Sequence, residues 1–229
     1  MRFKMPVIRR RVACLVGTGA LVLAGVGGLA VSGAGQASAA TCTPGVDCTI
    51  TGTADLGTGT LSLTTPASLT WGTTLTGVAQ QLVDTSTSDT SLTINDATGS
   101  ATGWHVTVGA TTFTTGTVTL SNTGTLVANG STSSETTPAT PSVNCTTPGD
   151  CTVPTSTTAP VTYPVAITTA SGTPTVLYSA DGGTGVGSVL FGANATTGAN
   201  PLAWWVNVLG STHIGTYTST FTFNIVSGP

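Results

Sequence analysis

The sequence predicts an all-β protein folded as an antiparallel β-sandwich. Apolar and polar residues alternate with a period of two in several short stretches, which is the pattern of strands buried on one face. Gly, Asn, Asp and Thr separate these stretches at the short intervals expected of tight turns, and no long stretch has helical periodicity. Many short alternating strands are typical of sandwiches, which gives the fold class.

The N-terminus has the features of a secretory signal peptide. A basic beginning is followed by an apolar stretch and by Ala37-Ser38-Ala39, a small-residue cleavage pattern. We therefore expect residues 1–40 to be removed on export and residues 41–229 to form the mature β-sandwich domain. A retained membrane anchor is the alternative, because the apolar stretch is about 20 residues long. No membrane span is expected after cleavage.

The charge of the mature chain excludes several functions. All five basic residues precede position 12 and all eight acidic residues follow position 40, so removal of the signal peptide changes the net charge from −3 to −8. Nucleic-acid binding, a phosphate clamp and a Schiff-base lysine all need cations that would be missing. Attraction to anionic wall polymers is expected to be poor unless divalent cations bridge the two.

The alternating stretches define which side chains share a strand face. In chain order, the predicted faces are Leu61 with Leu63, Leu69 with Trp71, Leu92 with Ile94, Trp104 with Val106 and Val108, Val161 with Tyr163, Val165 and Ile167, and Tyr217 with Phe221, Phe223 and Ile225. Threonine fills many opposite positions, where a β-branched side chain suits a pleated surface. His105 and Thr107 are expected to point away from the core.

Residues 129–160 differ from the rest of the chain because they are rich in Ser, Thr and Pro. Such a composition predicts a long loop that does not pack against the sandwich. It also raises O-glycosylation as a hypothesis.

Four cysteines follow the signal peptide, in two similar loops with C-x5-C spacing and an internal Pro-Gly. They are Cys42, Cys48, Cys145 and Cys151. In an exported chain such a set favours disulfides over metal ligands, and structural zinc pairs usually have shorter spacing. Because Pro-Gly favours tight turns, we predict the local bridges Cys42–Cys48 and Cys145–Cys151. Cross-pairing of the two loops is the alternative.

Nothing in the sequence indicates catalysis, a cofactor or a metal. His105 and His213 are the only histidines, and no nucleophile turn accompanies them. The glycine-rich run from Asp181 to Gly187 lacks the Lys and the following helix of a phosphate loop, so it is expected to be a hairpin or a loose connection. We therefore predict a protein that is not an enzyme.

The tryptophans are the better candidates for contact with a ligand, because this side chain stacks on sugars and on partner surfaces. Trp71 is expected to pack in the core. Trp204 and Trp205 are adjacent on a predicted strand, so one of the two is expected to be exposed. The candidate binding residues are Trp104, Trp204 and Trp205.

Two segments resemble the motifs of a known family. The first contains Trp104 and Val106 in the sequence Gly-Trp-His-Val, after a stretch that contains Asp96, Gly99 and Gly103. The second contains Phe223 and Ile225 in the sequence Phe-Asn-Ile, after a Gly-Thr-Tyr strand entry and close to the final Pro. Together they resemble the two motif regions of WxL-domain proteins, which Gram-positive bacteria export. The second segment has Phe-Asn-Ile where the family has Trp-x-Leu.

The resemblance implies a secreted cell-surface protein that associates non-covalently with the cell wall. Its partner would be peptidoglycan or another cell-wall glycan, and surface proteins are further candidate partners. The alternative is a structural or adhesive surface protein that binds a protein and no glycan. An extracellular hydrolase is a third, more distant interpretation.

Overall fold

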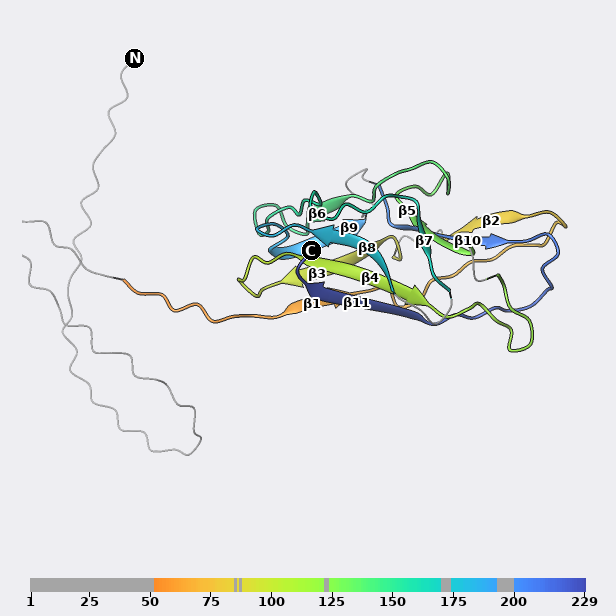
Figure 1. Cartoon of the computed structure of the whole chain (residues 1–229), viewed down its shortest axis with the longest axis horizontal. Coiled ribbons are helices and arrows are strands. Elements are labelled where there is room, and N and C mark those ends of the chain that lie inside the picture. Colours follow the sequence, from red (N-terminus) through yellow and green to blue (C-terminus); the bar gives the residue numbers. More distant parts are fainter. Residues whose placement is uncertain (1–51, 85, 87, 122–123, 170–173, 193–199) are drawn as a thin grey trace, which may run out of the picture. The chain divides into compact units, whose positions relative to one another are not determined.

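The computed structural model describes residues 52–229, except 85, 87, 122–123, 170–173 and 193–199. The described chain is all-β and contains no helix, and its strands form three antiparallel sheets (Figure 1). The strands are β1 (Leu61–Thr64), β2 (Gln80–Val83), β3 (Ser91–Asp96), β4 (Trp104–Ala110), β5 (Leu126–Asn129), β6 (Val143–Cys145), β7 (Val165–Ile167), β8 (Thr175–Ala180), β9 (Gly187–Gly192), β10 (Ala203–Val208) and β11 (Phe221–Ser227).

Sheet A has the strand order β1-β3-β9-β6, sheet B has β2-β10-β5-β7, and sheet C has β11-β4-β8. Sheets A and B are related because two consecutive strands of the chain pair with two other consecutive strands. Strand β2 is followed by β3 and pairs with β10, whereas β3 pairs with β9, the strand before β10. The pairing of β2 with β10 ends at Val83, and that of β3 with β9 begins at Ser91.

The predicted alternation produces the core of the sandwich. In β4, Trp104, Val106 and Val108 are buried while His105 and Thr107 lie half-exposed on the other face. Side chains from all three sheets meet in one hydrophobic cluster, so the predicted all-β sandwich is confirmed. Alternation of this kind removes apolar surface from water on one face and leaves the other face hydrated.

Two stretches differ from expectation. Residues 65–79, where Leu69 and Trp71 predict a strand, contain none. The backbone there bonds to a side chain instead of a ladder, since the Thr70 amide donates to the Asp84 carboxylate at 2.7 Å. The Ser/Thr/Pro-rich segment was expected not to pack, yet it contains β6 and buries Glu135.

The disulfide Cys145–Cys151 is present and confirms one predicted local bridge. Its loop lies beside β9, where Cys151 pairs with Gly187. The other predicted bridge, Cys42–Cys48, and the predicted signal peptide at residues 1–40 lie outside the described residues.

Candidate functional site

The two motif segments lie side by side in sheet C. Strands β4 and β11 pair directly, with Phe223 opposite Val108 and Ile225 opposite Val106. Trp104 is fully buried, and its indole N–H donates to the Gly185 carbonyl at 2.9 Å. The motif positions therefore point into the core, Phe223 and Ile225 being half-buried.

Trp204 and Trp205 are both buried, so the expectation that one is exposed is wrong. Only 1% of Trp204 and 5% of Trp205 is accessible. Trp204 faces the main core, where its ring lies 5.8 Å from that of Phe223. Trp205 points to the opposite face of sheet B, and its indole N–H donates to the Ser131 carbonyl at 2.9 Å.

The cover over Trp205 is the segment that follows β5. Asn129 organises this segment, because its side-chain amide donates to the carbonyls of Ser134, Glu135 and Thr137 at 2.9–3.0 Å. Glu135 reaches back onto sheet B, where Gln81 and Asn207 donate to its carboxyl oxygens. Sheet B is therefore covered on both faces, and with Trp104 buried in sheet C none of the three predicted binding tryptophans lies on the surface.

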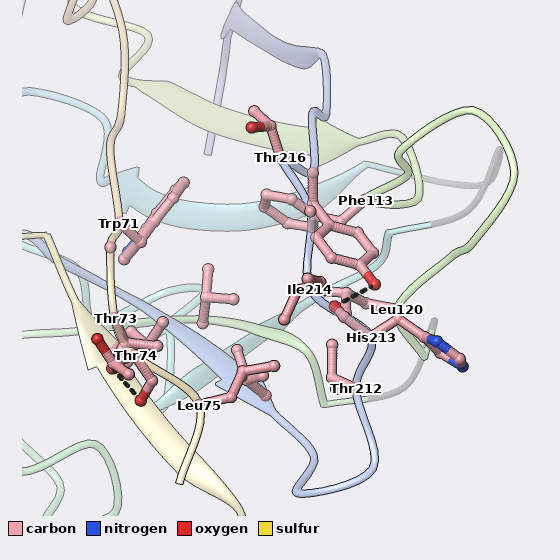
Figure 2. A pocket seen from close by; sticks show the side chains of 16 residues that line it. Trp71, Thr73, Thr74, Leu75, Phe113, Leu120, Thr212, His213, Ile214 and Thr216 are labelled. Carbon is pink, nitrogen blue, oxygen red and sulfur yellow. Dashed lines mark hydrogen bonds between the residues drawn. The ribbon is translucent and has the colours of Figure 1, made fainter.

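The described surface instead has a cleft of mixed aromatic and hydroxyl lining between residues 65–75 and residues 212–219. It consists of two adjoining hollows with volumes of about 490 and 630 Å³. Four residues line both hollows and mark the junction between them, which we call the waist: Trp71, Phe113, Thr216 and Tyr217. Figure 2 shows the first hollow, with Trp71, Thr73 and Leu75 facing Phe113, Ile214 and Thr216 across it.

Trp71 forms one wall of the cleft and is held in place on several sides. Its indole N–H donates to the Trp204 carbonyl at 3.0 Å, next to the point where the pairing of β2 with β10 ends. Its ring stacks on Phe221 with centroids 6.2 Å apart and meets Phe113 edge-on at 5.8 Å. Because these contacts already fix the ring, the Trp71 side chain would lose little conformational entropy when a ligand stacks on it.

Residues 212–219 form the opposite wall. The Tyr217 hydroxyl donates to the His213 carbonyl at 3.0 Å, which ties this segment into a compact turn. Ile214 lines the first hollow and is 89% exposed, so an apolar side chain is left in water at the edge of the cleft.

The lining of the cleft is neutral. Neither hollow is lined by Asp, Glu, Lys or Arg, and the polar groups are mainly Thr and Ser hydroxyls. Aromatic rings combined with hydroxyls suit a neutral, hydroxylated ligand whose faces are partly apolar. His213 is the only histidine in the lining of the two hollows.

The ionisable groups with shifted pKa values lie away from this cleft. Asp181 accepts hydrogen bonds from the Thr157 hydroxyl and from the Thr158 and Thr157 amides, and these hold its pKa well below the usual range. Burial raises the pKa of Tyr178 to about 12 and that of Tyr163 further. Within the described ranges no three His, Cys, Asp or Glu side chains gather as metal ligands.

Sequence reasoning missed the cleft because it assigned Trp71 to the core alone. Trp71 does pack against the core, but it also lines both hollows. One signal was available: the segment after Leu63 holds an aromatic residue among Thr, Ser and Gly, and Tyr217 stands in a similar setting. Trp71 and Tyr217 are separated by well over a hundred residues, and only the tertiary fold brings them together.

One comparison with known proteins identifies a family. The sequence profile described as "WxL domain surface cell wall-binding" matches residues 47–229. No curated protein and no solved structure matches the chain. Among the described residues, no helix is both long and apolar enough to span a membrane.

Proposed function

The chain belongs to the WxL family of surface cell wall-binding domains, and on that basis we propose that it binds the glycan strands of peptidoglycan non-covalently in the cleft around Trp71. Family membership makes it an extracellular, cell-wall-associated protein. The ligand and the location of its binding site are our proposal.

The observation that carries the proposal is the pairing of fixed aromatic rings with hydroxyls in a neutral cleft. Sugar rings present apolar C–H faces that stack on Trp and Tyr, and hydroxyl edges that bond to Thr and Ser. Trp71 and Tyr217 line both hollows, and Thr73, Thr74 and Thr216 stand beside them. A polyanionic ligand would need cations, which the described chain lacks.

The experiment is co-sedimentation of the protein with purified, insoluble peptidoglycan stripped of anionic polymers. Thr216 is exposed at the waist, so Thr216→Glu places bulk and charge in the cleft without disturbing the core. Thr222→Glu is the matched control, because Thr222 is exposed on β11 and lines neither hollow. Thermal unfolding of each variant shows whether the fold is retained.

We expect the wild type and Thr222→Glu to sediment with the peptidoglycan and Thr216→Glu to lose at least ten-fold in affinity, which corresponds to about 1.4 kcal/mol. Equal sedimentation of both variants would place the contact elsewhere. A wild-type protein that stays in the supernatant would favour the alternative of a surface protein that recognises a protein partner.

A further inference from the structure

We propose that the two hollows are consecutive subsites of one groove, which binds an internal stretch of a linear glycan and does not require a chain end. This inference rests on the proposed function, and it adds the length of the bound glycan and its position within the polymer chain. It follows from how the two walls contribute to the hollows.

Each wall passes through both hollows, in opposite directions. Along the first wall, residues 65–70 line the second hollow and residues 72–75 line the first. Along the other wall, residues 212–215 line the first hollow and residues 218–219 line the second. Two antiparallel segments therefore flank a single groove whose middle is the waist at Trp71 and Tyr217.

Each half of the groove has the size and chemistry of a subsite. The volumes of about 490 and 630 Å³ both lie in the range of sites that hold a drug-sized ligand. The first half offers Thr73, Thr74 and Thr212, and the second offers Thr65, Ser68 and Ser219, so hydroxyls are available throughout. A repeating neutral polymer can use both halves, because its next unit has the same chemistry as the last.

The waist gives the ligand a fixed point between the two halves. Trp71 lines both hollows and is held by its bond to the Trp204 carbonyl and by Phe221. A ring stacked there would have neighbouring units on both sides, which describes a position inside a chain. Binding energy should therefore increase with chain length until both halves are filled.

The test is calorimetric titration of the whole chain with peptide-free, carboxyl-reduced peptidoglycan glycans of two, four and six sugars, which are neutral. We expect affinity to rise at least ten-fold from two to four sugars and then to level off. Two variants block one half each: Thr74→Trp fills the first hollow and Ser68→Trp fills the second, both at exposed positions. Thr222→Trp adds the same bulk outside the groove.

Each blocking variant should lose the gain in affinity from two to four sugars, whereas Thr222→Trp should keep that gain. Equal affinity for two, four and six sugars would overturn the extended groove and leave the proposed function intact. A gain that survives either blocking variant would remove that hollow from the groove. No binding of any glycan, with no sedimentation on peptidoglycan, would instead refute the proposed function.

Discussion

At the scale of single residues, the fold stabilises buried carboxyl groups without using cations. Glu135 is only 6% exposed, and both of its carboxyl oxygens accept hydrogen bonds from side-chain amides, those of Gln81 and Asn207. Asp84 accepts from the backbone amides of Thr70 and Ser86 in the same way. Buried carboxyl groups are tolerated because hydrogen-bond donors fill their acceptor sites. If one donor is removed, the free energy lost on desolvating the carboxyl group is no longer offset.

The substitution Glu135→Gln tests this arrangement. It replaces one carboxyl oxygen of residue 135 by an NH2 group, which would face the side-chain NH2 group of Gln81 or Asn207. One buried donor is then left without an acceptor. We expect the free energy of unfolding in urea to fall by about 1–3 kcal/mol. Asp150→Asn, at an exposed position, is the control and should change it by less than about 0.5 kcal/mol. Equal stability of Glu135→Gln and wild type would contradict the argument.

Asp181 gives a pH dependence of defined sign. Its pKa is lowered in the folded state by bonds from the Thr157 hydroxyl and the Thr158 amide. The ionised Asp181 carboxylate therefore stabilises the folded protein fully at pH values above about 3.9, the pKa of Asp in the unfolded chain. This stabilisation is lost as the pH falls toward the pKa of Asp181 in the folded protein. We expect Asp181→Asn to destabilise the protein most at pH 7. The gap to the wild type, measured by urea unfolding, should narrow at pH 3, and a constant gap would rule out this linkage.

At the scale of elements, sheet B owes its stability to a cover that lies outside the strands. Trp205 on β10 and Val127 on β5 form a small second core under the segment after Asn129. The segment is anchored from both sides, by the Trp205 bond to Ser131 and by the Glu135 bonds to the sheet. Trp205 is therefore a structural residue, positioned to hold the cover.

Trp205→Ala should lower the free energy of unfolding by about 3–5 kcal/mol, which is the usual effect of removing a buried aromatic side chain. Proteolysis by an enzyme that cleaves after Glu should also become faster at Glu135, because the cover loosens. Sedimentation of the folded protein with peptidoglycan should not change. Loss of sedimentation by the folded variant would show that Trp205 takes part in binding.

How far the sequence predicts an element depends on where its partners lie. Alternation predicts β4 and β3 because each of these strands has one buried face. For β10 the strand is predicted but its exposed face is not observed, because Ala203–Val206 is buried on both faces, the pattern of a doubly covered strand. Alternation fails at Trp71, whose hydrogen-bond partner, the Trp204 carbonyl, lies 133 residues away.

At the scale of the whole molecule, the surface of the described chain is almost free of charge. The described residues contain no Lys or Arg, and five of their seven acidic residues are buried. Only Asp55 and Asp150 are exposed. The composition predicts a strongly acidic mature protein, but it cannot predict that most of the carboxyl groups face inward, since this depends on tertiary contacts.

Binding to peptidoglycan should consequently be insensitive to ionic strength and to chelators. We expect sedimentation in 1 M NaCl, or with EDTA, to match that in 50 mM NaCl within about twofold, because the described part of the chain has no Lys or Arg whose contact salt could screen. The control is Thr222→Arg with walls that retain their anionic polymers, where added salt should reduce binding. A steep salt dependence of the wild type would indicate an ionic contact or a bridging cation.

The anchoring of Trp71 has a mechanical consequence. A glycan stacked against Trp71 and pulled by a cell wall under tension would load the backbone at Trp71 directly, and the indole hydrogen bond would pass part of that load to the Trp204 carbonyl. Trp204 belongs to β10, which is held by β2 on one side and β5 on the other. That part of the load would thus enter a strand supported along both edges, where shear is shared between two neighbours.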